Sequence, residues 1–228
     1  NIIRGIAIGP NDDVYLADAG NRRMQVMNRM GVWQRTFGQG RFGGDMRGLA
    51  VDFDNEWIYV SDSANNQVDK FTLSGTYLLS MGSRGTGPAQ FVDGGRELTL
   101  GLNGNVYAPD MGGYKTNVYS PQGVHLFSFP SPAESPPNGG FNWPFDVEVD
   151  TARNAVYVAD TFNHRVQRIA EDGEISTLPG SGVDPAEDGL DGPAGVAVGP
   201  DGLLYVVDTG NDRVLRFDAE DRPAGLVG

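Results

Sequence analysis

A Tyr-x-x-Asp tetrapeptide recurs five times along this chain of 228 residues, and each copy closes a short stretch with the composition of a β-strand. Successive tyrosines are 44, 48, 50 and 48 residues apart. Such a period is typical of a four-stranded unit repeated around an axis, and not of a single long fold. The five copies are Tyr15–Asp18, Tyr59–Asp62, Tyr107–Asp110, Tyr157–Asp160 and Tyr205–Asp208.

Each repeat begins with a short apolar strand that ends in a turn such as 9–13 or 199–202. Pro, Gly and Asn in these turns make the second strand antiparallel to the first. Third and fourth strands follow, rich in β-branched and aromatic residues, and no stretch has sustained helical periodicity. The sequence therefore predicts an all-β fold of four-stranded antiparallel units. The expected first strands are 5–8, 48–51, 97–100, 146–149 and 195–198.

The aspartate that ends each second strand is followed five residues later by a polar partner. Three residues after the aspartate stands Asn, or Gly113 in the third repeat, and both types tolerate a left-handed turn. This spacing closes a hairpin in which the carboxylate accepts from turn amides and pairs with the incoming side chain. Because it recurs in every repeat, we interpret it as a structural clasp. The expected pairs are Asp18–Arg23, Asp62–Gln67, Asp110–Lys115, Asp160–Arg165 and Asp208–Arg213.

Longer loops rich in Gly and Pro connect the repeats, and each carries one large apolar residue shortly before the next first strand. We interpret these residues as plugs that seal one repeat against the next, because neighbouring units of repeat proteins bury a shared core. Residues 131–137 form a low-complexity stretch that we expect to be an exposed insertion. The expected plug residues are Phe42, Phe91, Phe141 and Leu190.

The stretch Tyr-Val-Ala-Asp-Thr-Phe-Asn-His-Arg-Val-Gln at 157–167 resembles the signature of NHL repeats, and 205–215 and 15–25 are close copies. Residues 82–91 resemble the loop that joins consecutive NHL units. The resemblance covers essentially the whole chain. The third repeat departs most, since Pro109 lies inside its second strand and 112–114 replaces the usual turn, so we expect a distorted hairpin there.

What the resemblance implies is a β-propeller, usually six-bladed in this family, whereas five repeats are counted here. The chain would then be a single NHL-like domain over residues 1–228. Three arrangements stay open: a ring closed by five blades, a segment of a larger propeller, or a ring whose gap a partner covers. The expected blades are approximately 1–40, 41–84, 85–130, 131–180 and 181–228.

The charge balance bears on the class of partner. The chain has 17 Lys and Arg residues and 30 Asp and Glu residues. The resulting formal net charge of −13 repels nucleic acids and anionic membranes. The absence of cysteine excludes disulfides and thiol catalysis, and no apolar run approaches about 18 residues. We therefore expect no nucleic-acid partner and no membrane insertion. The compartment stays open, with an extracellular or periplasmic location favoured.

Candidates for catalysis and metal binding are few. We interpret His164 as a turn residue and His125 as a strand residue, and lyases of similar architecture that hold zinc with three histidines need more than these two. An acidic loop offers carboxylates to calcium but lacks EF-hand spacing, so we interpret it as a solvated surface loop. We predict no catalytic residue, metal site or cofactor, with calcium the candidate ion if the chain were an enzyme. The loop contains Asp184, Glu187, Asp188 and Asp191.

An arginine stands directly before the first strand in the first three repeats: Arg4, Arg47 and Arg96. Innermost strands surround the channel of a propeller, so the three guanidiniums would line one arc of its mouth and suit a carboxylate or phosphate. Trp143 and Phe145 would supply the apolar side of such a pocket. The alternative is that the arginines pair with carboxylates and brace the loops. Those carboxylates are Asp45, Asp93 and Glu97.

These observations favour a non-enzymatic binding or assembly module that presents its loops and channel mouth to a protein or to a small anionic ligand. A protein partner is expected, and the ligand is not specified by the sequence. The alternative is a metal-dependent lyase or hydrolase with a divalent cation in the central channel. RNA binding, known for NHL propellers with a basic face, is disfavoured by the net charge.

Overall fold

The structure is a computed structural model that describes residues 2–101, 103–130, 140–170, 174–179 and 189–227. The chain divides into two compact units. The first comprises residues 1–113 and 117–128, and the second comprises residues 114–116 and 129–228. The insertion expected at 131–137 lies outside the described residues.

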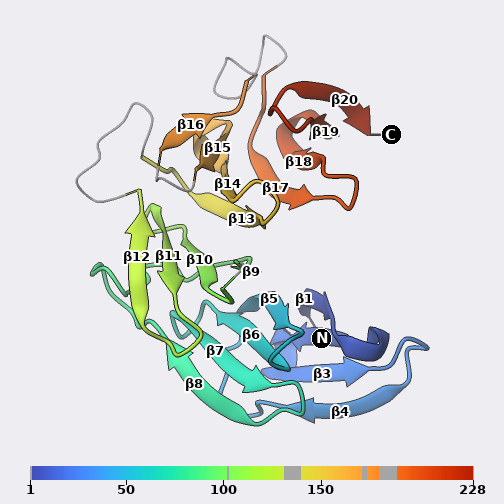
Figure 1. Cartoon of the computed structure of the whole chain (residues 1–228). Coiled ribbons are helices and arrows are strands. Elements are labelled where there is room, and N and C mark those ends of the chain that lie inside the picture. Colours follow the sequence, from blue (N-terminus) through green and yellow to red (C-terminus); the bar gives the residue numbers. More distant parts are fainter. Residues whose placement is uncertain (1, 102, 131–139, 171–173, 180–188, 228) are drawn as a thin grey trace. The chain divides into compact units, whose positions relative to one another are not determined.

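The described strands form five four-stranded antiparallel sheets, each with its strands in chain order (Figure 1). The first sheet contains β1 (Ile3–Ile8), β2 (Val14–Asp18), β3 (Arg23–Met27) and β4 (Trp33–Phe37). The second contains β5 (Met46–Asp52), β6 (Trp57–Asp62), β7 (Gln67–Thr72) and β8 (Tyr77–Met81). The third contains β9 (Thr99–Leu100), β10 (Val106–Asp110), β11 (Lys115–Tyr119) and β12 (His125–Phe129).

Two sheets belong to the second unit. The fourth sheet contains β13 (Pro144–Asp150), β14 (Ala155–Asp160), β15 (Arg165–Ile169) and β16 (Ile175–Thr177). The fifth contains β17 (Pro193–Val198), β18 (Leu204–Asp208), β19 (Arg213–Phe217) and β20 (Pro223–Val227). Short 3-10 turns stand between strands at η1 (Pro10–Asp12), η2 (Ala19–Asn21), η3 (Thr161–Asn163) and η5 (Thr209–Asn211).

The prediction of an all-β fold built from four-stranded antiparallel units is confirmed. No helix in the described ranges is both long and apolar enough to cross a membrane.

The third sheet departs from the expected pattern at its first strand. Residues 97–100 were expected to pair, but β9 covers only Thr99 and Leu100, opposite Tyr107 and Val106. Continuing this register would bring Pro109 opposite Glu97. Because Pro109 has no N–H to donate, the ladder stops before it reaches that position.

Plug residues and strand side chains share the cores between neighbouring sheets. Phe42 is buried with Met24 and Phe71 between the first two sheets. The ring centroids of Phe42 and Phe71 lie 5.6 Å apart. Phe91 belongs to the core of the second and third sheets, and Leu190 to that of the fourth and fifth. Each sheet is therefore stabilised mainly by apolar contact with its neighbour, as expected for a repeat protein.

Glycines let the innermost strands of the first unit approach one another. Strand β1 lies against β5, and β5 against β9. A Cβ on Gly5 would overlap the carbonyl oxygen of Arg47, and a Cβ on Gly48 would overlap that of Arg96. The first part of β1 and of β5 can therefore lie close to the backbone of the next repeat, because neither glycine carries a side chain.

We expect Gly5→Ala to destabilise the protein by about 1–3 kcal/mol, because the new methyl group meets a backbone carbonyl that cannot move without shifting β5. Gly87→Ala is the matched control, since its Cβ would meet only the flexible end of Gln90. Urea unfolding of both variants measures the difference. Equal stability of the two variants would contradict the close approach.

Candidate functional site

The clasp forms in the first, fourth and fifth sheets as an ion pair between a buried aspartate and an arginine. Arg23 Nε lies 2.9 Å from Asp18 Oδ2, and the equivalent distance is 2.7 Å for Arg165 and Asp160. It is 2.6 Å for Arg213 and Asp208. In each case an asparagine three residues after the aspartate also donates its side-chain amide to the same carboxylate: Asn21, Asn163 and Asn211.

The second and third repeats satisfy their aspartates differently. Gln67 donates to Asp69 at 2.9 Å, so the expected pair with Asp62 is replaced by a contact between two residues on the same strand face. Asp62 accepts from the N–H of Gly43 and from the side chain of Asn65.

In the third repeat, Asp110 accepts from the N–H groups of Val92, Asp93 and Gly113, while Lys115 is buried at the start of β11. The pair expected between Asp110 and Lys115 stays a prediction.

The clasp also fixes the plug loop, which sequence reasoning missed. The residue after each plug donates its N–H to the clasp aspartate of the following hairpin. Asp191 N lies 2.6 Å from Asp208 Oδ1, directly after Leu190. The other three contacts run from Gly43 to Asp62, from Val92 to Asp110 and from Asn142 to Asp160, at 2.9, 3.0 and 2.6 Å.

The residue before the plug is held as well. Arg213 Nη2 and Asn211 Nδ2 donate to the carbonyl oxygen of Gly189, at 3.0 and 2.9 Å. Arg165 and Asn163 bind Gly140 in the same way. Each plug is thus held by the backbone on both sides. The signal in the sequence was the narrow range of the distance between plug and clasp, from 20 residues between Phe42 and Asp62 to 18 between Leu190 and Asp208.

The pKa values of two clasp carboxylates are shifted in opposite directions, because the partners outweigh burial at one and not at the other. Burial opposes ionisation of Asp18, but hydrogen bonds from Asn21, Arg23 and Gln25 outweigh it and lower the pKa. Burial raises the pKa of Asp62, and the N–H of Gly43 offsets only part of that shift. Burial also raises the pKa of Asp160 although Arg165 pairs with it, so a cation in the clasp opposes the effect of burial without always outweighing it.

The arginine expected before each first strand lies at a β-bulge in the first two sheets. The pairing of β1 with β2 shifts register between Ile3 and Gly5, and that of β5 with β6 shifts between Met46 and Leu49. These shifts contain Arg4 and Arg47. The equivalent shifts in the fourth and fifth sheets contain Phe145 and Ala194. A bulge takes a side chain out of the regular alternation of the strand.

The structure brings the three arginines of the first unit together. Arg4 Nε lies 3.5 Å from Asp45 Oδ1, and Arg47 Nε lies 3.0 Å from the same oxygen. Arg96 donates its Nε–H to Met111 Sδ at 3.0 Å. Burial lowers the pKa of Arg96, with further lowering from the nearby charge of Arg47 and of Arg4. We call Arg4, Arg47 and Arg96 the arginine cluster.

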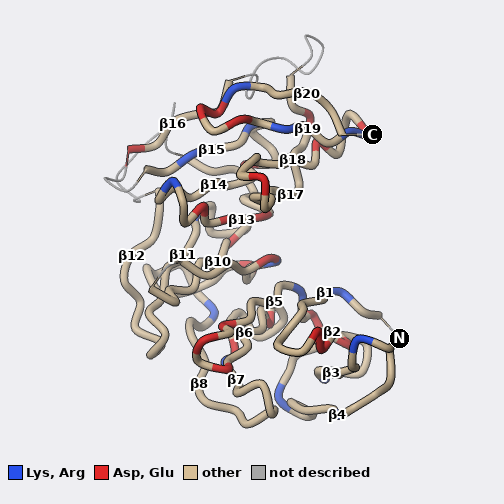
Figure 2. Tube along the Cα trace, turned by 45° about the vertical axis from the view of Figure 1, so that its right-hand side comes forward, with Lys and Arg blue, Asp and Glu red and all other residues tan. Residues whose placement is uncertain are grey.

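Carboxylates accompany the arginine cluster. Asp45 contacts two of its members, which supports the bracing interpretation for Arg4 and Arg47. Asp93 and Asp45 both favour the charged form of Arg96, and Arg47 favours the charged form of Glu97. In Figure 2, acidic and basic residues are interspersed along the tube.

The aromatic residues expected beside the arginines belong to the second unit. Trp143 has a positive φ of 57° and stacks on Phe162, with ring centroids 5.0 Å apart and planes 25° apart. Phe145 lies in the bulge of β13. The arginine cluster belongs to the first unit, so a pocket that combines both groups stays a prediction.

The two histidines have local partners. His164 caps η3 in the left-handed conformation, and its Nδ1 lies 3.0 Å from Asp191 Oδ1. His125 Nε2 lies 2.9 Å from Ser128 Oγ. Asp184, Glu187 and Asp188 of the acidic loop lie outside the described residues. Within the described part of the chain, no three His, Asp or Glu side chains are grouped so that they could hold a metal ion.

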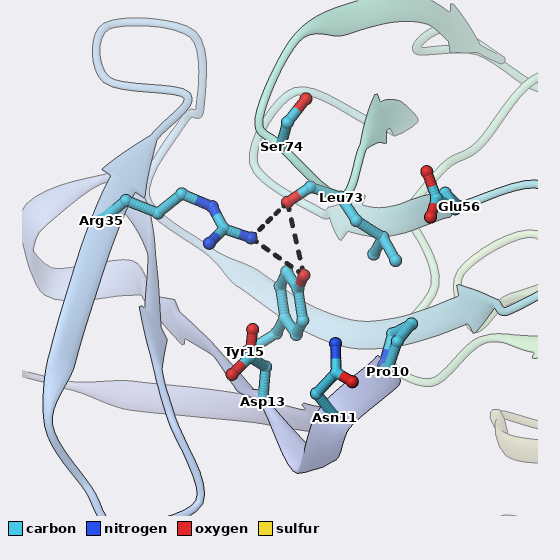
Figure 3. Close-up of a pocket in the computed structure, with 8 residues that line it drawn as sticks. All are labelled: Pro10, Asn11, Asp13, Tyr15, Arg35, Glu56, Leu73 and Ser74. Atoms are coloured by element: carbon cyan, nitrogen blue, oxygen red, sulfur yellow. Dashed lines mark hydrogen bonds between the residues drawn. The ribbon is translucent and has the colours of Figure 1, made fainter.

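A pocket of about 350 Å³ opens between the first and second sheets. Figure 3 shows the Arg35 guanidinium directed at the Tyr15 hydroxyl and the Leu73 carbonyl oxygen, and Arg35 Nη2 lies 3.1 and 2.6 Å from these two atoms. Burial raises the pKa of Tyr15, Arg35 opposes the shift, and Asp13 adds to it. The tyrosine therefore stays protonated at neutral pH and donates to Leu73 O.

The same contact recurs at two other sheet interfaces, so we interpret it as structural. Lys70 Nζ donates to Pro121 O at 2.8 Å and lies over the ring of Trp57. Arg168 Nε lies 3.3 Å from Asp221 Oδ2. In each case a cation reaches the turn between the third and fourth strands of the next sheet. We call Arg35, Lys70 and Arg168 the latch cations. Lys70 and Arg168 lie directly opposite the repeated tyrosine of their own sheet, whereas Arg35 lies one strand further away, on β4.

Comparisons with known proteins agree with the predicted fold. The family model of the NHL repeat matches residues 190–217. Human NHL repeat-containing protein 2 is 31% identical over 113 residues, which is 46% of this chain and 16% of that protein. The matched region is thus less than a fifth of the length of this curated relative. The chain carries an NHL repeat, as its sequence predicted.

Two solved structures share the fold at low identity. A catalytically inactive virginiamycin B lyase from Staphylococcus aureus with quinupristin is similar with a TM-score of 0.77 and 17% identity, over 97% of this chain and 68% of the lyase chain. A nidogen/laminin complex is similar with a TM-score of 0.74 and 18% identity, over 99% and 79% of the respective chains. The β-propeller fold class is confirmed.

We expect Asp18→Asn to cost about 1–3 kcal/mol of stability at neutral pH, because it removes the charge that Arg23 neutralises in a buried site. Asp62→Asn is the matched substitution without a cation partner, and we expect it to cost less than about 1 kcal/mol. Denaturant unfolding of the two variants at neutral pH measures the difference. A larger loss for Asp62→Asn would show that the arginine is not the decisive partner.

The two clasps should respond oppositely to acid. Because the pKa of Asp18 is lowered in the folded protein, its carboxylate contributes its full stabilisation of the fold above pH 3.8. This contribution is lost as the pH falls through the pKa of the folded state. Because the pKa of Asp62 is raised in the folded protein, its ionised form destabilises the fold at neutral pH. Protonation of Asp62 as the pH falls toward 3.8 removes this destabilisation. On acidification the cost of Asp18→Asn should shrink and that of Asp62→Asn should grow. Unfolding measured from neutral pH to below 3.8 checks both signs, and parallel trends would contradict them.

Proposed function

We propose that this protein is a non-enzymatic binding and assembly module, and that its arginine cluster recognises a carboxylate group. The observation that supports this proposal is the convergence of guanidiniums from three successive repeats. Two of them contact Asp45, and the third lies close enough for its pKa to be lowered by both. Guanidinium groups bind carboxylates through paired, charge-assisted hydrogen bonds.

The contacts with Asp45 leave the arginine cluster able to bind a ligand. The side chains of Arg4 and Asp45 are 37% and 34% exposed. Ion pairs of such exposure are worth about 0–1 kcal/mol, so an incoming carboxylate can replace Asp45 at little cost. Bracing of the loop in the free protein and recognition of a ligand are therefore compatible roles for Arg4, while the side chain of Arg47 is 19% exposed.

The surrounding charge narrows the class of ligand. Asp45, Asp93 and Glu97 balance the formal charge of the arginine cluster, and the whole chain carries −13. Long-range repulsion therefore works against polyanions such as nucleic acid. The favoured ligand is a single carboxylate or a few, carried by a protein partner or by a small molecule.

The similar structures are compatible with a protein partner. One of them is a nidogen/laminin complex, in which a protein of this fold belongs to an assembly of two proteins. Metal-dependent lyase or hydrolase activity, the alternative raised by the sequence, stays a prediction. Metal analysis of the purified protein tests it, and a stoichiometric divalent cation would favour it over the binding module.

The double variant Arg47→Ala with Arg96→Ala should bind carboxylates at least about tenfold more weakly, because each charge-assisted hydrogen bond contributes about 1.5–3 kcal/mol. The probes are citrate and a labelled peptide that ends in two glutamates, titrated by calorimetry and fluorescence anisotropy. The double variant Arg29→Ala with Arg84→Ala removes the same charge elsewhere and should bind like the wild type. An unchanged affinity in the first variant, with its melting temperature preserved, would remove the proposal.

A further inference from the structure

The second repeat differs from the first and the fourth in the charges of its buried clasp. In those two repeats, a cation follows the clasp aspartate after five residues and a glutamine after seven: Arg23 and Gln25, and Arg165 and Gln167. The second repeat has Gln67 and Asp69 at these positions. An amide therefore replaces the cation, and a second carboxylate replaces the amide.

The two carboxylates of the second repeat occupy positions that are in contact in the first. Asp69 has the same place in the register of its sheet as Gln25 has in the first sheet. Gln25 Nε2 lies 2.7 Å from Asp18 Oδ2. Burial raises the pKa of Asp62, and the charge of Asp69 adds to that shift. Since both side chains are fully buried, the second sheet holds two neighbouring carboxylates away from water.

Each of these carboxylates has one oxygen that its neighbours leave poorly satisfied. Asp69 Oδ1 accepts from Ser80 Oγ at 2.5 Å and from Gln67 Nε2 at 2.9 Å. Asp69 Oδ2 is buried and has no hydrogen-bond partner among the residues that the structure describes. Asp62 Oδ1 has one donor, the N–H of Asn65, at 3.3 Å. Buried carboxylates without a cation are costly, so this position calls for a positive partner.

Arg41, the cation that acts on Asp69, does not supply this partner. Its guanidinium lies over the Tyr77 ring, with Cζ 3.2 Å from the ring centroid, and it forms no ion pair with Asp62 or Asp69. Burial raises the pKa of Asp69, and the charge of Arg41 is the smallest of the effects that oppose this shift. A cation that contacts both carboxylates directly is therefore still needed.

Two neutral groups complete the surroundings of the pair. Gln67 directs its amide nitrogen at Asp69, and no described residue donates to its Oε1. Ser80 holds Asp69 from the neighbouring strand and contacts the Tyr77 hydroxyl at 3.0 Å. Carboxylate and amide oxygens are calcium ligands, and calcium accepts about six to eight oxygens, water included, in a flexible geometry. The group suits calcium better than magnesium, which demands near-ideal octahedral geometry.

We propose that Asp62, Asp69 and Gln67 bind a calcium ion, which takes the place of the arginine in the clasp of the second repeat. The ion balances both carboxylates and supplies Asp69 Oδ2 with the partner that it lacks. Asp62 also accepts from the N–H of Gly43, so the ion stabilises the loop that carries Phe42 as well as the hairpin. The site uses no residue of the arginine cluster, and it is structural and not catalytic.

The proposal is tested on the full chain, purified with a chelator and then titrated with calcium. An ion that binds only the folded state raises its melting temperature. At a calcium concentration about a hundredfold above Kd, we expect a rise of at least about 5 °C. Terbium in place of calcium should luminesce when tyrosine is excited, because Tyr77 contacts Ser80 beside the site. Calcium should displace the terbium and remove this signal.

The double variant Gln67→Arg with Asp69→Gln is the matched control, because it gives the second repeat the clasp residues of the first and fourth. It should stay folded, lose the terbium signal and keep the same melting temperature with and without calcium. Asp69→Asn removes one charged ligand with little change of shape, and it should lose most of the calcium-dependent rise. The unfolding comparison of Asp18→Asn with Asp62→Asn is made in chelator, so that it reports the clasps without calcium.

Three results would overturn the proposal. The first is a wild-type protein whose melting temperature and terbium luminescence do not respond to calcium. The second is an equal response in the double variant, because the ion would then be bound elsewhere. The third is a calcium-dependent rise that Asp69→Asn leaves intact. Metal analysis of the double variant also separates this ion from a catalytic cation, which would persist in it. Carboxylate binding by the arginine cluster is tested independently.

Discussion

A buried carboxylate that accepts hydrogen bonds from two segments at once is the interaction on which the repeats depend. Asp208 accepts from Asn211 and Arg213 of its own hairpin and from the N–H of Asp191 in the preceding loop. A buried carboxylate without partners is strongly unfavourable, so both segments must be in place to satisfy it. The clasp therefore links the closing of a hairpin to the seating of Leu190 between two sheets.

Backbone geometry explains why the arginine cluster exists at all. Gly5 and Gly48 let the innermost strands approach until a carbonyl oxygen occupies the place of a side chain. The bulges that contain Arg4 and Arg47 then turn these side chains out of the sheet. Equivalent positions in adjacent repeats meet as a result, and the same constraint that packs the strands gathers their charges.

Much of the fold could be predicted from the sequence because the repeat is expressed in short-range patterns. The Tyr-x-x-Asp tetrapeptide, the turn residues and the alternation of apolar residues fixed the four strands of each unit. The third repeat showed the limit of this reasoning, since the missing N–H of Pro109 shortens β9 to two residues. All three clasps in which an arginine was expected contain it, whereas Gln67 donates to Asp69 in place of Asp62.

The candidate site was predictable in its residues, and pairing with Asp45 was one of two alternatives that the sequence left open. Position alone pointed to Arg4, Arg47 and Arg96, whereas the shared contact with Asp45 depends on three-dimensional packing between repeats. The latch cations escaped sequence reasoning because they change strand: Arg35 lies on β4, but Lys70 and Arg168 lie on third strands. A repeat pattern identifies residues at equivalent positions. It does not identify a contact whose cation lies on different strands in different repeats.

The claim that clasp and plug act as one unit is tested most directly by a double-mutant cycle on Asp208→Asn and Leu190→Ala. Denaturant unfolding of the wild type, the two single variants and the double variant gives the coupling free energy. The account predicts a coupling of about 0.5–3 kcal/mol, because loss of the plug releases the loop whose N–H the carboxylate binds. Additive effects of the two substitutions would contradict it.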